Sequence, residues 1–192
     1  MFKYVISELA TMAGGRLVGN VDNVESIRHL LTDSRKIMAP SSSLFFAMKG
    51  DRRDGHEFIP ELHAAGVRSF VVCDESAAVA YPDACFLVVN DTLTALQKIA
   101  AAHRNKFKYP VVAITGSNGK TTTKELIHAV LSQKYACKAT VGNLNNHIGI
   151  PLTILRIPMD TEMAIIEMGA NHQREIAGYC TYALPSHGII NN

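Results

Sequence analysis

Residues 115–123, with the sequence Thr-Gly-Ser-Asn-Gly-Lys-Thr-Thr-Thr, combine the residue types that bind a chain of phosphates. The two glycines let the backbone curl so that several N–H groups point toward one anion. Lys120 brings a positive charge to the β- and γ-phosphates, and Thr121 offers a hydroxyl group to Mg²⁺. The residues predicted to bind the phosphates are Gly116, Ser117, Asn118, Gly119, Lys120, Thr121 and Thr122.

This motif lacks the first glycine of the full phosphate-loop pattern, because Ile114 occupies that position. A glycine-rich turn with a solvated lysine would be the favoured explanation of an isolated Gly-Lys-Thr sequence. The context favours the phosphate loop, since the sequence predicts an apolar strand over residues 111–115 and a helix over residues 120–134. A helix that begins at the loop adds unpaired backbone donors and a partial positive charge.

Glu167 ends a second apolar strand, predicted over residues 163–167. Sites that hold magnesium and phosphate commonly include an acidic residue at the end of a neighbouring strand. An isolated glutamate at a strand end would more simply be a solvated side chain. Beside a phosphate loop, we predict that Glu167 and Thr121 are metal ligands.

Apolar strands and helices alternate around these residues, which is typical of an α/β fold. In the second half, the strands predicted over residues 111–115, 163–167 and 188–190 are apolar on both faces, as in a parallel sheet that is covered on both sides. The first half is predicted to contain strands over residues 16–18, 29–32, 44–47, 69–72 and 85–89, and helices over residues 8–13, 56–65 and 92–105. A polar segment that ends at Pro110 separates the halves, so we predict domains over residues 1–106 and 107–192.

The composition is that of a globular protein rather than a disordered one, with 192 residues, 47% of them hydrophobic and 19% charged. A net charge of +2 argues against a nucleic-acid-binding protein. The four cysteines form no C-x-x-C pair, which favours reduced thiols in the cytosol. The sequence contains no secretory signal and no apolar stretch that approaches about 18 residues. We therefore expect a cytoplasmic monomer that binds neither nucleic acid nor membranes.

Several motifs together resemble those of the Mur ligases of bacterial cell-wall synthesis. They are residues 115–123, the segment Gly-Asn-Leu-Asn-Asn-His-Ile-Gly-Ile-Pro over residues 142–151, and Glu-Met-Gly-Ala-Asn-His over residues 167–172. Residues 32–35, 44–50 and 54–58 are similar to the N-terminal domain of the same family. The resemblance covers the whole chain. It implies a small N-terminal α/β UDP-binding domain, followed by the first part of a P-loop-type parallel-sheet ATPase domain.

This resemblance also implies an activity, with ATP and Mg²⁺ as cofactors. The asparagine-rich motifs are most similar to those of the members that join D-alanyl-D-alanine to UDP-N-acetylmuramoyl-tripeptide. ATP would phosphorylate the terminal carboxylate of the tripeptide, and the amine of the dipeptide would then expel phosphate. Lys120 and Glu167 are the implied catalytic residues, because charge must be neutralised while a carboxylate attacks a triphosphate.

The substrate-binding residues that the resemblance implies lie in both halves. Those expected near the muramoyl-peptide are Asn143, Asn145, Asn146, Asn171 and His172, and those expected near the uridine diphosphate are Ser34, Arg35, Lys49 and His56. Turn formation would also explain the asparagines. A local ion pair with Asp33 would also explain Arg35. Arg174 departs from the family pattern, which usually has glycine at that position.

The family's central domain continues beyond residue 192, so we expect this chain to be an N-terminal fragment that is inactive by itself. One alternative is another Mur-type or folylpolyglutamate-type ligase that joins a carboxylate to a different amine. A second alternative is a non-catalytic module that binds UDP-sugars or nucleotides.

Overall fold

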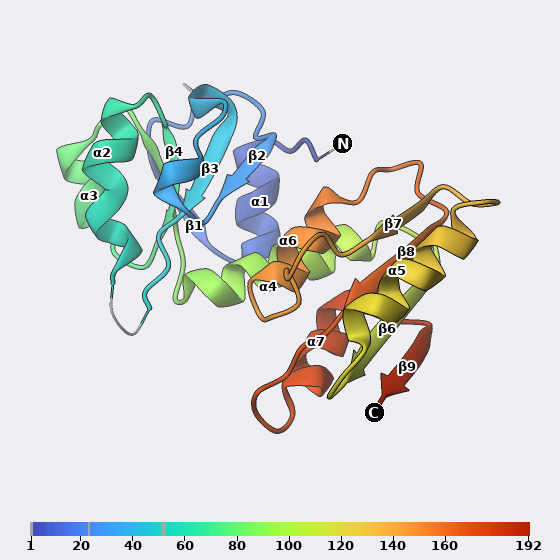
Figure 1. Cartoon of the computed structure of the whole chain (residues 1–192). Helices are drawn as coiled ribbons and strands as arrows, with labels where there is room; N and C mark the ends of the chain where they lie inside the picture. The colour runs from blue at the N-terminus through green and yellow to red at the C-terminus, as the bar shows by residue number, and fades with distance from the viewer. Residues whose placement is uncertain (1, 23, 51–52) are drawn as a thin grey trace. The chain divides into compact units, whose positions relative to one another are not determined.

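The computed structural model describes residues 2–22, 24–50 and 53–192, and it has the α/β fold that the sequence predicts (Figure 1). The chain forms two compact units, Phe2–Ile99 and Ala100–Asn192, each with its own sheet. The division falls within the long helix α4 (Thr92–Arg104), a little before the boundary predicted between residues 106 and 107. Within the described ranges, no helix combines the length and the hydropathy that a membrane crossing requires.

The first unit is built on a five-stranded sheet with the strand order β1-β5-β4-β3-β2. Strands β2 to β5 are parallel, whereas β1 is antiparallel to β5. The strands are β1 (Arg16–Gly19), β2 (His29–Leu31), β3 (Ser43–Phe46), β4 (Ser69–Val72) and β5 (Cys85–Val88). The helices are α1 (Ile6–Ala13), α2 (Ile59–Ala64) and α3 (Ser76–Ala80), with short 3₁₀ helices η1 (Ser34–Lys36), η2 (Pro40–Ser42) and η3 (Gly55–Phe58).

Aromatic side chains fill the core of this first unit. Phe70 stacks on Phe86 with the ring centroids 5.3 Å apart, and Phe45 meets Phe70 in an edge-on arrangement at 6.5 Å. Every residue of β3 and β4 is buried, so both faces of the sheet are covered, as is usual for parallel strands. Each buried phenylalanine contributes about 1.5–3 kcal/mol to folding.

The second unit carries a four-stranded sheet with the order β7-β8-β6-β9, in which all neighbouring strands are parallel. Its strands are β6 (Val111–Gly116), β7 (Cys137–Ala139), β8 (Met163–Glu167) and β9 (His187–Asn191). Its helices are α5 (Lys120–Leu131), α6 (Gly149–Arg156) and α7 (Glu175–Ala183) (Figure 1). The connection through α5 crosses the sheet in the opposite direction to those through α6 and α7. Right-handed crossovers therefore put α5 on one face and the other two helices on the other face.

Several elements differ from the sequence prediction. Helix α6 is not among the predicted elements, because it is only eight residues long and its first turn contains Gly149 and Pro151, residue types that usually indicate a turn. The predicted elements also lack α3, α7 and the short strand β7. The helix predicted over residues 56–65 begins as η3 before it continues as α2, and the helix predicted to reach residue 134 ends at Leu131.

Candidate functional site

The predicted phosphate loop connects β6 to α5, and it is held against the neighbouring strand β9. Gly116 and Gly119 have φ angles of +133° and +72°, which glycine adopts far more readily than other residues. A Cβ atom on Gly116 would overlap the backbone of Asn191 in β9. Asn191 also accepts a hydrogen bond from the Ser117 N–H (3.2 Å) and donates one to the Thr123 hydroxyl (2.6 Å). A glycine is therefore required at position 116 by its close packing against β9 as well as by the curl of the loop.

Lys120 is the first residue of α5, and its side chain folds back over the loop. The Nζ atom donates hydrogen bonds to the carbonyl oxygens of Gly116 (2.6 Å) and Ser117 (3.3 Å). This puts the ammonium group at the loop that the N-terminus of α5 also faces. A side-chain charge and a helix N-terminus at one place favour the binding of an anion.

Glu167 lies at the end of β8, and only 2% of its surface is exposed. Strand β8 runs parallel to β6, so the carboxylate emerges at the same edge of the sheet as the phosphate loop. The Thr121 hydroxyl donates to Glu167 Oε2 (2.9 Å), and the Asn145 amide donates to Glu167 Oε1 (2.8 Å). The structure thus brings together three residues that the sequence singles out, from α5, from β8 and from the asparagine-rich segment.

The chemistry of this group of side chains fits a magnesium ion. A threonine hydroxyl and a carboxylate are hard oxygen ligands, and Mg²⁺ usually adds phosphate oxygens and water to one or two such protein groups. The hydrogen bonds from Thr121 and Asn145 hold the Glu167 carboxylate in one orientation beside the loop.

Lys124 is a further charged residue at this site, and it is 1% exposed. Its Nζ atom donates to the Thr140 carbonyl oxygen (2.9 Å) and lies 2.9 Å from Glu125 Oε1 and 3.9 Å from Glu167 Oε2. The hydrogen bond from Lys124 keeps the pKa of the Glu125 carboxyl below its usual range. The Thr140 hydroxyl in turn accepts a hydrogen bond from the backbone N–H of Glu167 (3.0 Å).

Lys124 is not among the residues that the motifs predict, although the sequence contains a signal for it. Lys124 shares one helical face with Ile127 and Leu131, which pack against the sheet. A lysine within the apolar stripe of an amphipathic helix indicates a buried charge that has partners.

The asparagine-rich segment has two separate roles in the structure. Asn145 is half-buried and bonds to Glu167, and its carbonyl oxygen accepts a hydrogen bond from the Gly169 N–H (2.7 Å). Asn146 instead uses its side-chain oxygen to accept from the N–H groups of Ile148 (3.2 Å) and Gly149 (2.8 Å), where α6 begins. The turn-forming interpretation therefore describes the observed contacts of Asn146. Asn143 is exposed on the same segment.

Asn171 and His172 are exposed, and they precede α7. Their backbone N–H groups both donate to Glu175 Oε2, at 2.7 Å and 3.1 Å, and these bonds lower the pKa of the Glu175 carboxyl. Arg174 has a φ angle of +69°, in the left-handed region that favours glycine. This conformation gives a physical reason for the glycine that the family usually carries at that position.

In the first unit, Arg35 forms the local ion pair that the sequence offers as an alternative. Its Nε and Nη2 atoms donate to the two carboxylate oxygens of Asp33, each at 2.8 Å. The hydrogen bond from Arg35 lowers the pKa of Asp33 to about 2. The arginine side chain is 84% exposed, and the half-buried Ser34 begins η1 beside it.

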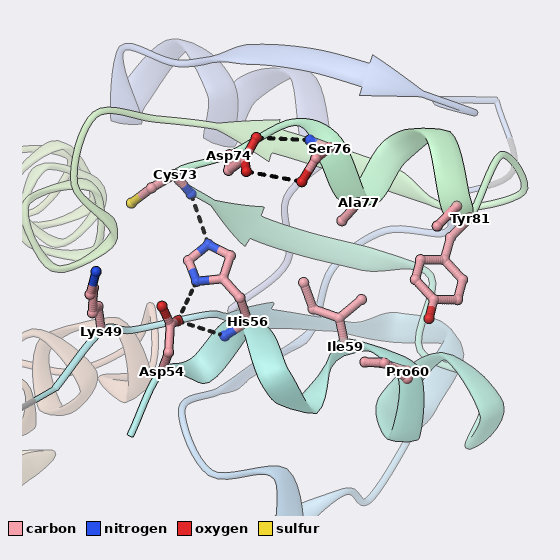
Figure 2. Close-up of a pocket in the computed structure, with 11 residues that line it drawn as sticks. Lys49, Asp54, His56, Ile59, Pro60, Cys73, Asp74, Ser76, Ala77 and Tyr81 are labelled. Atoms are coloured by element: carbon pink, nitrogen blue, oxygen red, sulfur yellow. Dashed lines mark hydrogen bonds and ion pairs between the residues drawn. The ribbon is translucent and has the colours of Figure 1, made fainter. Parts of the chain in front are cut away.

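Lys49 and His56 line one cavity of about 570 Å³ in the first unit (Figure 2). The His56 ring lies between two partners, because its Nδ1 atom is 2.5 Å from Asp54 Oδ1 and its Nε2 atom accepts from the Cys73 N–H (3.1 Å). Since Nε2 accepts a hydrogen bond, Nδ1 carries the ring proton and donates a hydrogen bond to Asp54. Both ring nitrogens of His56 therefore bond within the protein, while Lys49 is exposed at the cavity.

Comparisons with known proteins agree with this geometry. A protein-family model described as "Mur ligase family, catalytic domain" matches residues 26–104, and a second model, "Mur ligase middle domain", matches residues 114–192. The chain is 41% identical, over its whole length, to the UDP-N-acetylmuramoyl-tripeptide–D-alanyl-D-alanine ligase of Bacillus subtilis. It is 38% identical to the protein of the same name from Escherichia coli. It covers 41% and 40% of these two proteins, so it spans about two fifths of their length.

Solved structures give the same result. A crystal structure of MurF from Acinetobacter baumannii superposes with a TM-score of 0.89 at 34% identity, over 98% of this chain and 40% of that one. The MurF ligase from Thermotoga maritima, solved in complex with ADP, superposes with a TM-score of 0.69 at 32% identity, over 82% of this chain and 36% of that one. The two family descriptions together match most of the sequence, and we conclude that the chain belongs to the Mur ligase family, as its motifs predict.

Proposed function

We propose that this chain is the part of an ATP-dependent ligase that binds the nucleotide and the UDP-linked substrate. The reaction would join D-alanyl-D-alanine to UDP-N-acetylmuramoyl-tripeptide. The names of the relatives support this choice of substrates, and the ADP complex of the Thermotoga maritima relative supports the nucleotide. The observation that carries the proposal is the hydrogen bond between Thr121 and the buried Glu167 beside the phosphate loop.

The chemistry requires two displacements. A carboxylate oxygen of the tripeptide attacks the γ-phosphorus of ATP, and ADP leaves with the electrons of the broken P–O bond. The amine nitrogen of the dipeptide then attacks the acyl carbon, inorganic phosphate leaves, and the nitrogen loses a proton. Magnesium, when bound, would neutralise charge on the phosphates.

In this proposal the phosphate loop, residues 116–122, holds the triphosphate through backbone N–H groups. Lys120 moves its ammonium group from the loop carbonyls to the β- and γ-phosphates. Thr121 and Glu167 hold the metal, and Asn145 keeps the Glu167 carboxylate oriented. Positioning and charge neutralisation supply most of the rate in such phosphoryl transfers.

We assign the uridine diphosphate end of the substrate to the first unit, with Ser34, Arg35, Lys49 and His56 as candidates. Lys49 is exposed at the cavity and supplies a charge for a phosphate. His56 would shape the site, because both of its ring nitrogens already have partners. Arg35 would have to exchange its bonds to Asp33 for bonds to the substrate. Asn143, Asn146, Asn171 and His172 remain candidates for the muramoyl-peptide end.

The central test replaces Lys120 with alanine in a longer protein that carries this chain together with the segments that its relatives add. Lys120→Ala should reduce the release of phosphate in the presence of ATP, UDP-N-acetylmuramoyl-tripeptide and D-alanyl-D-alanine by at least about 100-fold. Binding of the UDP-linked substrate, measured by calorimetry, should stay within about twofold of the parent value. Lys134→Ala, at an exposed lysine just past α5, is the matched control. Unchanged turnover in Lys120→Ala would refute the role proposed for this residue.

Two alternatives are separated by the substrates that are consumed. A Mur-type or folylpolyglutamate-type ligase for another amine would release phosphate with a different amino acid and not with D-alanyl-D-alanine. A non-catalytic module would bind UDP-sugars or nucleotides and release no phosphate with any amine. We expect the 192-residue chain by itself to bind ligands without turnover, and robust ligation by it would contradict that expectation.

A further inference from the structure

The buried ammonium group of Lys124 is the least expected charge in the second unit. Lys124 and Glu167 are 1% and 2% exposed, and Lys124 Nζ lies 3.9 Å from Glu167 Oε2. A buried charge is strongly destabilising unless it is paired and hydrogen-bonded. Lys124 meets this condition through the Thr140 carbonyl oxygen and through Glu125, whose own side chain is 63% exposed. Helix α5 thus holds a positive charge 3.9 Å from the Glu167 carboxylate.

We propose that Lys124 is a positioning residue that balances the charge of Glu167, so that a divalent cation binds there only together with a nucleotide polyphosphate. This inference rests on the proposed nucleotide site and assigns an order to its ligands. It gives Lys124 no contact with the reacting atoms.

Charge balance supports the proposal. Glu125 and Glu167 balance the charges of Lys120 and Lys124, so these four side chains together carry no net charge. A divalent cation that arrives alone would meet two carboxylates, one of them largely exposed to water, and two ammonium groups. The several negative charges of a bound di- or triphosphate make the net charge negative, and attraction over a few ångströms in a partly buried site is strong.

The geometry also explains why Lys124 does not become a direct partner of the carboxylate. Glu167 Oε2 already accepts from the Thr121 hydroxyl at 2.9 Å, and Lys124 is held back by Thr140 at 2.9 Å. The ammonium therefore acts on Glu167 through its electrostatic field, while the two carboxylate oxygens accept hydrogen bonds from Thr121 and Asn145. A lysine in direct contact would compete with a metal for the same oxygen.

The test measures the binding of Mn²⁺, a paramagnetic substitute for Mg²⁺, to the 192-residue chain by electron paramagnetic resonance. The parent chain should bind Mn²⁺ at least about tenfold more tightly with ADP than without it. Lys124→Met, which keeps an unbranched side chain only one atom shorter and removes the charge, should bind Mn²⁺ without ADP at least about tenfold more tightly than the parent. Lys124→Arg should behave as the parent does. Adding Glu167→Gln to Lys124→Met should abolish the gain.

Two results would overturn the proposal. One is tight binding of Mn²⁺ to the parent chain without ADP, which decides the question even if Lys124→Met fails to fold. The other is a folded Lys124→Met chain whose affinity for Mn²⁺ alone equals that of the parent. A chain that binds no ADP, by calorimetry, would refute the proposed nucleotide site instead, and the gain expected for Lys124→Met without ADP is tested independently of it.

Discussion

Glu167 shows how a protein can accommodate a buried carboxylate side chain. A carboxylate without water is unstable unless donors and opposite charge replace the lost hydration. Thr121 and Asn145 supply one donor to each carboxylate oxygen, and Lys124 supplies the opposite charge. The side chain is therefore held rigidly before any ligand arrives, which reduces the reorganisation needed during reaction.

Arg174 is predicted to be a site where a substitution stabilises the protein. Its left-handed conformation, with φ at +69°, is unfavourable for a side chain with a Cβ atom. Arg174→Gly should raise the free energy of unfolding by about 0.5–1 kcal/mol, which is the strain relieved less the added entropy of glycine in the unfolded chain. Urea unfolding measures this change. Arg174→Ala, which removes the charge but keeps the strain, should show no gain, and an equal gain in both variants would assign the effect to charge.

His103 should make the stability depend on pH. The side chain is 2% exposed, and burial lowers its pKa to about 4, below the usual value near 6.5. Between these values the unfolded chain binds the proton and the folded chain does not, so stability falls as the pH drops from about 6.5 toward 4. The full loss is about 3 kcal/mol. Unfolding midpoints of the parent and His103→Gln at pH 7 and pH 4.5 test this, and equal pH dependence in both would contradict it.

At the level of elements, local patterns predict the strand, the loop and the helix around Lys120, because apolar runs and glycines act over a few residues. The pattern does not predict α6, a short helix whose first turn contains a glycine and a proline. It also does not predict that Asn146 accepts hydrogen bonds from the backbone where α6 begins while its neighbour Asn145 bonds to Glu167. These two adjacent asparagines have the same chemistry, and only the path of the chain between β7 and β8 separates their roles.

The phosphate loop should not tolerate a side chain at its first glycine. Gly116→Ala would force a Cβ atom into the backbone of β9, so it should destabilise the second unit by more than about 2 kcal/mol and weaken ADP binding. Gly178→Ala, in α7 with open space around the added Cβ, is the control and should stabilise by up to about 1 kcal/mol. Thermal unfolding and calorimetry with ADP measure both effects. If Gly116→Ala were as stable as the parent, β9 would have to move away from β6 at little cost in free energy, which would contradict this prediction.

On the scale of the whole molecule, a substitution that destabilises the core of one unit should leave the stability of the other unit unchanged. Phe70 is fully buried in the first unit, between Phe45 and Phe86. Phe70→Ala should destabilise that unit by about 3–5 kcal/mol. Hydrogen exchange followed by mass spectrometry should then show lost protection in β3 to β5, with β6 and β8 unchanged. Equal loss in both units would show that the chain folds as one cooperative block.

The sequence also predicts the two-part organisation, since the polar segment before Pro110 follows the first run of strands. What it does not contain is the pairing of distant residues, such as Thr140 with both Lys124 and Glu167. These contacts depend on the strand order β7-β8-β6, which places the end of β7 next to the end of β8. Long-range strand order is therefore the information that turns separate motifs into one site.

Asn191 has a mechanical consequence, because it touches the phosphate loop through its backbone and its side chain together. The backbone of Asn191 leaves little space between the phosphate loop and β9. Any shift of residues 116 and 117 as an anion enters would push directly on β9. Strand β9 would then move together with the loop when the nucleotide binds.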